Sequence, residues 1–327
     1  MKKIITIMFS MMTLIVGISI GCANDGTADV TTDGVSSGWV IVGNNGAIRY
    51  TTDDGATWAA RTSGTTDHLR SVASNGATGW VAVGAGGGVH YSTDSGVSWT
   101  AGTSNTGNLL YGVAYDDNHW MALGLSGTAL YSFDGGATWT AGVFASPTST
   151  LYQAAYDGAT RWVAVGDSGI VRMSFDGGAN WTDGGTANNS EHTYAIAHDG
   201  NNRYVSVGDN GSVSYSTDGG VSWTSGISGT GNILKSVAYD GNSRWVAVGI
   251  IGTVIYSTDG GANWTVVTSG ITEDLKSVAY DGTSRWVAVD NDGNSTSGVH
   301  YSTDGGANWT TGQSGTTDAI FGVDFGK

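Results

Sequence analysis

The sequence predicts an all-β protein, a seven-bladed β-propeller with four-stranded antiparallel blades. Three observations support this prediction: one nine-residue motif recurs seven times, its copies are spaced 40–45 residues apart, and glycine is abundant. A period near 40 residues with several short strands in each unit is typical of propellers. Glycine accounts for 54 of the 327 residues and proline for only one, which suits many tight turns.

The recurring motif places Asp two residues after a Ser or Thr, Gly two residues later and Trp three further on, as in Ser257, Asp259, Gly261 and Trp264. Asp can accept hydrogen bonds from backbone N–H groups one or two residues ahead, and Gly supplies the positive φ of a tight turn. Trp then begins the returning strand and covers the hairpin. We therefore predict a structural role for Asp53, Asp94, Asp134, Asp176, Asp218, Asp259 and Asp304. The motif resembles the Asp-box, or bacterial neuraminidase repeat, which lies away from known active sites.

Each repeat is expected to supply its four strands in chain order. In the clearest unit, 234–239, 245–249 and 253–256 are the first three strands, and a short polar fourth strand starts at Trp264. The apolar second strands predict burial on both faces, between two neighbouring blades; they begin at Trp39, Trp80, Trp120, Trp162, Tyr204, Trp245 and Trp286. The blade that contains Trp39 lacks a first strand, so we expect residues 320–325 to fill that place and close the ring.

Residues 1–21 have the basic start and apolar core of an export signal. Their end resembles a bacterial lipoprotein signal, so we predict cleavage before Cys22 and lipid attachment to it. The alternatives are an ordinary free thiol at Cys22 or a transmembrane anchor. Residues 22–37 would then be the lipidated cysteine with a flexible tether, and 38–327 the propeller. We expect an exported protein of the bacterial cell envelope, held by its lipid on the outer membrane, its periplasmic face or the cell surface.

The formal net charge of −15 disfavours binding to nucleic acid and to anionic membrane surfaces, and it favours a soluble monomer. The only cysteine is Cys22, so no intrachain disulfide can form. The histidines show no paired ligand spacing, and we predict no cofactor and no metal. Residues 290–294 alternate oxygen side chains like a calcium loop, but they lack its sixth-position Gly and closing Glu, so we interpret them as a solvated loop.

Candidate catalytic groups are few, and we assign none. Four arginines occupy one repeated position and cannot converge on a single substrate, so a structural role is predicted for Arg161, Arg203, Arg244 and Arg285. The alternative for them is a basic stripe that contacts a partner. The chain has two glutamates, and paired Asp carboxylates remain open for a glycosidase, which places them about 5–10 Å apart.

Beyond the motif, the chain resembles the photosystem II stability and assembly factor family and its bacterial relatives. Residues 162–166 (WVAVG) and the run from Gly169 through Ser174 to Trp181 match that family's repeating pattern. The resemblance implies an exported, chaperone-like binder that performs no chemistry. We predict a non-catalytic binding or assembly scaffold for a protein or carbohydrate partner. The alternatives are a glycoside hydrolase of the sialidase or xyloglucanase kind, since these enzymes carry the same motif, and a structural surface protein.

The predicted binding site is the rim of the central channel, where the first strands begin. In ring order, the second residue of each first strand is Phe321, Arg70, Tyr111, Tyr152, Tyr194, Lys235 and Lys276. One arc is aromatic and can stack on apolar groups, while another is cationic and can attract carboxylates or sulfates. The alternative is that these side chains only fill the gap between adjacent blades.

Overall fold

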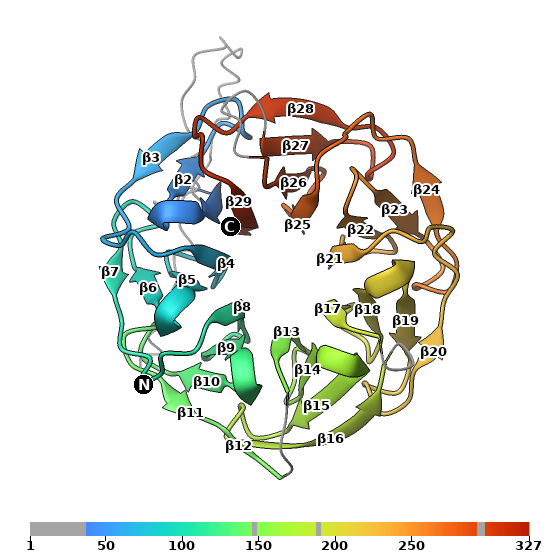
Figure 1. Cartoon of the computed structure of the whole chain (residues 1–327), viewed down its shortest axis with the longest axis horizontal. Helices are drawn as coiled ribbons and strands as arrows, with labels where there is room; N and C mark the ends of the chain where they lie inside the picture. The colour runs from blue at the N-terminus through green and yellow to red at the C-terminus, as the bar shows by residue number, and fades with distance from the viewer. Residues whose placement is uncertain (1–36, 146–148, 188–190, 293–297, 327) are drawn as a thin grey trace, which may run out of the picture.

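The structure is a computed structural model that describes residues 37–145, 149–187, 191–292 and 298–326. Within these ranges, seven sheets surround a central channel (Figure 1). In each sheet the strand predicted to come first is innermost, and in every blade but blade 4 the strand that follows the Asp-box is outermost. The seven-bladed propeller is therefore confirmed. Residues 1–36, with the predicted signal and Cys22, lie outside the described residues. In the described part of the chain, no helix is long and apolar enough to cross a bilayer.

The blades follow one another along the chain. Blade 1 contains β1 (Gly38–Gly43), β2 (Ile48–Thr51), β3 (Ala59–Arg61) and the C-terminal β29 (Ile320–Gly326). Blade 2 contains β4 (Leu69–Ser74), β5 (Trp80–Gly84), β6 (Val89–Ser92) and β7 (Thr100–Ala101), and blade 3 contains β8 (Leu110–Tyr115), β9 (Trp120–Gly124), β10 (Ala129–Ser132) and β11 (Thr140–Ala141). Blade 4 contains β13 (Leu151–Tyr156), β14 (Trp162–Gly166), β15 (Ile170–Ser174) and β16 (Asn180–Thr186).

The remaining blades repeat this arrangement. Blade 5 contains β17 (Thr193–His198), β18 (Tyr204–Gly208), β19 (Val213–Ser216) and β20 (Thr224–Ser225). Blade 6 contains β21 (Leu234–Tyr239), β22 (Trp245–Gly249), β23 (Val254–Ser257) and β24 (Thr265–Val267), and blade 7 contains β25 (Leu275–Tyr280), β26 (Trp286–Asp290), β27 (Gly298–Ser302) and β28 (Thr310–Gln313). Blade 4 departs from the prediction, because β12 (Val143–Phe144), leaving blade 3, adds a fifth strand parallel to β16.

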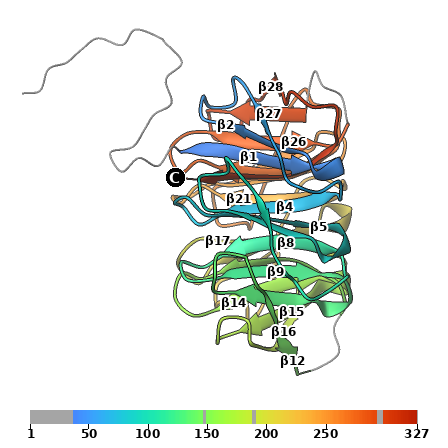
Figure 2. The same cartoon turned by 90° about the vertical axis from the view of Figure 1, so that its left-hand side faces the viewer.

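The core lies between the blades rather than inside any one of them. Every residue of the second strands is buried, because both faces of these strands pack against neighbouring blades. In one interface, Val246 and Val248 of blade 6 pack with Leu275 and Trp286 of blade 7. Seen from the side, the blades pack face to face, and their strands run between the two faces of the ring (Figure 2).

The C-terminal strand closes the ring as predicted. β29 pairs with β1 in antiparallel register, from Gly38 opposite Gly326 to Gly43 opposite Ile320. Ile320 and Val323 are buried in a core that they share with blade 7. Blade 1 is thus made from both ends of the propeller sequence. Its inner strand β29 lies between the inner strands of blade 7 and blade 2 and closes the ring.

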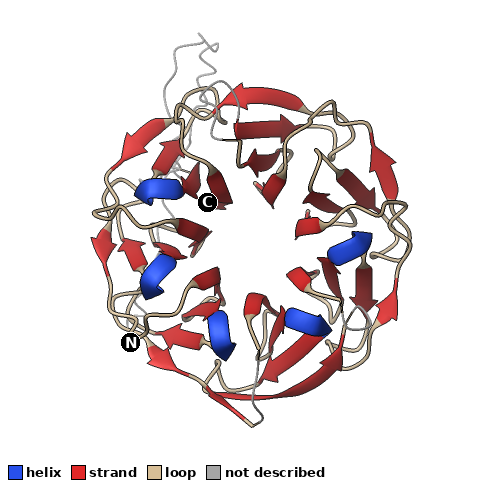
Figure 3. Ribbon diagram, in the orientation of Figure 1, coloured by secondary structure: helices blue, strands red, loops and turns tan. Residues whose placement is uncertain are grey.

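The two faces of the ring carry different turns. Short 3₁₀ turns link second to third strands on the face seen in Figure 3: η1 (Asn44–Gly46), η2 (Ala85–Gly87), η3 (Leu125–Gly127), η4 (Asp167–Gly169) and η6 (Asp209–Gly211). The middle residue of each has a positive φ between 53° and 62°. First strands begin on this same face, because each starts opposite the end of a second strand. The Asp-box turns, which follow third strands, therefore lie on the opposite face.

The Asp-box turns are held by a repeated set of hydrogen bonds. In blade 6, Ser257 Oγ donates to Asp259 Oδ1 at 2.9 Å and accepts from Gly261 N–H at 3.0 Å, while Trp264 Nε1 donates to Gly261 O at 2.9 Å. The Asp259 carboxylate accepts from the backbone N–H of Asn263 at 2.9 Å. That donor lies four residues ahead, not the predicted one or two, because the turn places the Asp side chain over the start of the returning strand.

The repeated arginines connect neighbouring blades. Each donates to a backbone carbonyl in the Asp-box turn of the next blade: Arg161 to Gly219, Arg203 to Gly260, Arg244 to Gly305 and Arg285 to Asp54. His119 makes the equivalent contact in blade 3, with its Nε2 2.6 Å from Gly177 O. These contacts give the arginines a structural role at the inter-blade boundaries.

Candidate binding site at the channel rim

The central channel holds a cavity of about 450 Å³ lined by the inner strands of all seven blades. Each inner strand pairs with its own blade on one side only, so the other edge of its backbone faces the channel (Figure 1). Such an edge can pair with an extended segment of another chain only where the neighbouring blades leave its N–H and C=O groups unbonded. The channel is therefore lined by backbone as well as by side chains.

A β-bulge marks the start of every inner strand. In blade 2, Leu69 pairs with Gly84 and Ser71 with Val83, which leaves Arg70 without a partner in the ladder. The residues skipped in this way are Arg70, Tyr111, Tyr152, Tyr194, Lys235, Lys276 and Phe321. They are the seven residues of the predicted rim, and all of them line the cavity. A bulge re-aims a side chain, and the repeated bulge turns one side chain per blade towards the channel mouth.

The aromatic arc forms a continuous row across blades 3, 4 and 5. The ring centroids of Tyr111 and Tyr152 are 5.0 Å apart, and those of Tyr152 and Tyr194 are 5.1 Å apart. The Tyr152 hydroxyl donates to Asp167 Oδ1 at 2.6 Å. Burial, followed by this hydrogen bond, raises the pKa of Tyr152, and burial with Asp209 raises the pKa of Tyr194 in the same way. These hydroxyls therefore stay protonated at physiological pH.

The cationic arc continues the row on blades 6 and 7. Lys235 Nζ lies 3.5 Å from the ring centroid of Tyr194, and Lys276 Nζ lies 3.3 Å from Asp274 Oδ2. Burial, and then the neighbouring Lys276, lowers the pKa of Lys235. An anion that approached the two ammonium groups would relieve their repulsion. On blades 1 and 2, Arg70 Cζ lies 4.2 Å above the ring centroid of Phe321.

The rim side chains thus pack on one another along the ring, yet each remains partly exposed. The alternative stated in the sequence analysis was that these side chains only fill the gap between adjacent blades. Such packing explains their contacts with one another, but it does not explain why part of each side chain is exposed to the channel. Binding at this rim remains a prediction.

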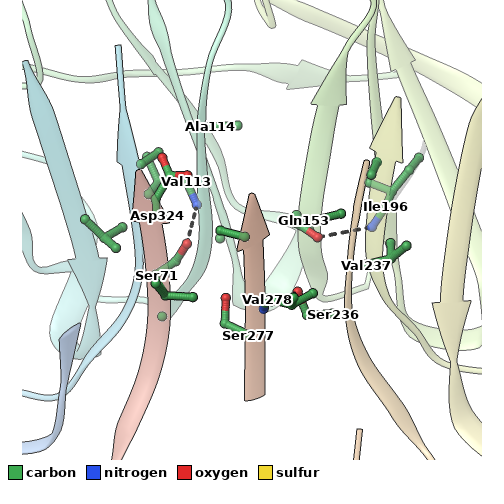
Figure 4. A pocket seen from close by; sticks show the side chains of 18 of the residues that line it. Ser71, Val113, Ala114, Gln153, Ile196, Ser236, Val237, Ser277, Val278 and Asp324 are labelled. Atoms are coloured by element: carbon green, nitrogen blue, oxygen red, sulfur yellow. Dashed lines mark hydrogen bonds between the residues drawn. The ribbon is translucent and has the colours of Figure 1, made fainter. Parts of the chain in front are cut away.

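Polar side chains below the rim tie the inner strands together. Ser71 Oγ accepts the backbone N–H of Val113 at 3.2 Å, and Gln153 Oε1 accepts that of Ile196 at 3.1 Å (Figure 4). Ser236 Oγ accepts the N–H of Val278 in the same way. Each bond crosses from one blade to the next, so these contacts hold the channel wall at a fixed width.

Asp324 is the one carboxylate among the described residues that line the cavity, and the sequence interpretation missed it. It accepts the backbone N–H of Ser74 at 2.8 Å, and burial raises the pKa of its carboxyl to about 6. The other six inner strands carry Ala at this position: Ala73, Ala114, Ala155, Ala197, Ala238 and Ala279. Alignment of the seven first strands would have revealed the exception.

The predicted solvated loop at 290–294 is described only as far as Asp292. Within that part, the prediction is wrong for Asp290: its side chain is fully buried, and its Oδ2 lies 2.8 Å from His300 Nε2. The carboxylate points into blade 7 because His300, on the adjacent strand, supplies its partner. Among the described residues, no group of three or more His, Cys, Asp or Glu side chains is placed to hold a metal ion.

The sequence profile of a family described as "Photosynthesis system II assembly factor YCF48" matches residues 97–253, just under half of the chain. The chain is similar to the photosystem II assembly factors. The match runs from the Asp-box of blade 2 into blade 6, so it spans whole repeats rather than one motif. A comparison with curated proteins found no match.

Solved structures share the fold at low sequence identity. "YCF48 bound to D1 peptide" has a TM-score of 0.60 and 18% identity, covering 77% of this chain and 84% of that chain. "YCF48 from Cyanidioschyzon merolae" has a TM-score of 0.62 and 19% identity, covering 82% and 91%. The computationally designed Ika8 protein reaches the same TM-score at 12% identity, covering 86% of each chain. At these identities the structures establish the propeller fold alone.

Proposed function

We propose that the protein is a non-catalytic scaffold that binds an extended segment of a protein partner at the channel rim. The observation that carries this proposal is the convergence of seven bulged side chains on one channel mouth, in an aromatic and a cationic arc. Peptide segments suit such a rim, because aromatic faces hold apolar side chains and cations hold carboxylates. The similarity to the photosystem II assembly factors, one of which is described as bound to a D1 peptide, supports a protein partner.

The hydrolase alternative has less support from the channel. Glycosidases use two carboxyl groups that flank the scissile bond about 5–10 Å apart. Among the described residues that line the cavity, Asp324 is the only carboxylate. The rim tyrosines contact one another in edge-on or tilted geometry, and they present aromatic surface to the channel.

The binding test compares two tyrosines on the same strand. Tyr152 lies at the rim, while Tyr156 lies at the other end of β13. Random 12-residue peptides displayed on phage would be selected on the purified full chain and then titrated against its variants. We expect Tyr152→Ala and Lys235→Ala each to weaken binding about tenfold, the equivalent of losing ~1.4 kcal/mol of contact, and Tyr156→Ala to leave it unchanged.

The melting temperature separates binding from packing in the same variants. Weakened binding at an unchanged melting temperature would support the rim. A lowered melting temperature with intact peptide binding would mean that these side chains are only core. If no peptide is selected while a glycan array binds the chain, the partner would be a carbohydrate and not a protein.

Membrane attachment through lipid on Cys22 is the second part of the proposal, and it would hold the rim near envelope partners. It rests on the basic and apolar leader that ends at the only cysteine. Two acyl chains are needed for stable anchoring. Radiolabelled palmitate should be incorporated into the wild type and not into Cys22→Ser; equal labelling of both would contradict the anchor.

A further inference from the structure

Blade 6 carries a groove beside the rim. The groove has a volume of about 400 Å³ and lies between the turn at 250–252 and the loop at 268–272. Its lining combines the aliphatic side chains of Ile251, Val266 and Ile271 with Thr, Ser and Asn side chains. In other blades, small or polar residues occupy the equivalent positions. The residues equivalent to Ile251 are Asn45, Gly86, Ser126, Ser168 and Asn210. Val266 is replaced by Ala, Ser, Thr or Asp, and Ile271 is replaced by Thr in four repeats. The sister blades show that the fold does not require an apolar residue at any of these positions.

Ile251 is also in an unfavourable backbone conformation. Its φ is 55°, in the left-handed region where a β-branched residue is an outlier, and its side chain is 64% exposed. An exposed side chain gains little from the core to offset this strain. The equivalent Asn, Ser and Gly residues adopt the same φ more easily. Strained residues cluster at functional sites, and here the strained residue presents an exposed aliphatic side chain.

A single carboxylate joins the groove to the cationic arc. Asp274 Oδ1 accepts the backbone N–H of Ile251 at 3.0 Å, and Asp274 Oδ2 pairs with Lys276 Nζ at 3.3 Å. Lys276 and Lys235 both line the channel cavity, on neighbouring inner strands, and burial followed by Lys276 lowers the pKa of Lys235. The exposed isoleucine and the two ammonium groups are therefore parts of one surface.

We propose that a partner segment crosses the rim at blade 6, with an acidic side chain at Lys235 and Lys276 and an aliphatic side chain against Ile251 in the groove. The proposal rests on the proposed function and names the chemistry of the partner. Charge complementarity selects a carboxylate for the two lysines, and the aliphatic side chains of Ile251 and Val266, which are both exposed, select Leu, Ile or Val for the groove. The rim supplies the general contact, and blade 6 supplies the specificity.

The decisive variant is Ile251→Asn, which copies blades 1 and 5. We expect it to raise the melting temperature by about 2 °C, because it relieves strain, and to weaken binding of the selected 12-residue peptides about tenfold. A gain in stability together with a loss of binding is not expected of a residue whose role is only structural. The peptides selected on the wild type should share an acidic residue close to an aliphatic one.

The matched control is Val221→Ala, because Val221 is 57% exposed but lies on an Asp-box turn at the opposite face. It should leave binding unchanged, whereas Val266→Ala should weaken it. If Ile251→Asn binds the peptides as the wild type does while Lys235→Ala binds them more weakly, the groove proposal is wrong and the proposed function of the rim stands. If both variants bind the peptides as the wild type does, the groove proposal and the proposed function of the rim are both wrong. The wild type could also self-associate, and Ile251→Asn could abolish that self-association without changing peptide binding. This result would assign the groove to a second copy of the chain and overturn the proposal.

Discussion

Deletion of residues 319–327 is expected to abolish the cooperative unfolding of the propeller. These residues contain β29, the inner strand of blade 1, which pairs along the whole of β1. Ile320 and Val323 are 2% and 5% exposed. Burial of each such side chain is worth about 1.5–3 kcal/mol, and the deletion also uncovers the backbone of β1 and the face of blade 7. The combined loss is comparable with the ~5–15 kcal/mol that stabilises a typical domain.

Thermal unfolding followed by far-UV circular dichroism measures this effect. A control replaces residues 320–325 (IFGVDF) with residues 234–239 (LKSVAY), the equivalent strand of blade 6. The replacement should restore cooperative unfolding, because it supplies the same buried positions. A deletion variant that melts cooperatively at the wild-type temperature would show that β29 does not hold the ring closed.

Asp324→Asn is expected to stabilise the protein at pH 8 and to have no effect at pH 4. The pKa of the Asp324 carboxyl is about 6 in the folded state and about 3.9 in an unfolded chain. The folded state therefore favours the protonated acid, and stability falls as the pH rises from about 4 through 6. Above that range the charged carboxylate costs up to about 3 kcal/mol, and Asn removes the charge while it keeps an acceptor for Ser74 N–H.

Urea unfolding at pH 4, 6 and 8 tests the sign of this effect. The control is Asp117→Asn, which neutralises an exposed carboxylate near a strand end and should not reproduce the pH dependence. A wild type that is as stable at pH 8 as Asp324→Asn would show that the Asp324 carboxylate is not penalised inside the channel.

The repeats explain why so much of the fold could be predicted from one sequence. The seven copies of the Asp-box predicted the number of blades, their period predicted the length of each repeat, and the missing first strand of the Trp39 blade indicated closure by the C-terminus. Both features follow from simple counting along the chain. The extra strand β12 could not be predicted, because two residues with a parallel partner in another blade have no periodic pattern.

The candidate site was predictable in position but not in geometry. The second residue of each first strand could be read from the repeat, whereas the bulge that turns it towards the channel depends on backbone pairing. The partners of Asp290 and Asp274 were also hidden, because they lie 10 and 23 residues away and carry no motif. The strain at Ile251 could be recognised only from its backbone φ, although the sequence already shows Ile where sister blades have Asn, Ser or Gly.

Site-specific photocrosslinking tests the central claim most directly. A photoreactive benzoylphenylalanine would replace Tyr152 at the rim or, as the control, Phe175, which is 53% exposed on an Asp-box turn of the opposite face. The full chain would be irradiated in the membranes of its own host. The proposed function predicts a discrete protein adduct from position 152 and none from position 175. Adducts from position 175 alone would place the partner on the other face and contradict a binding site at the channel rim.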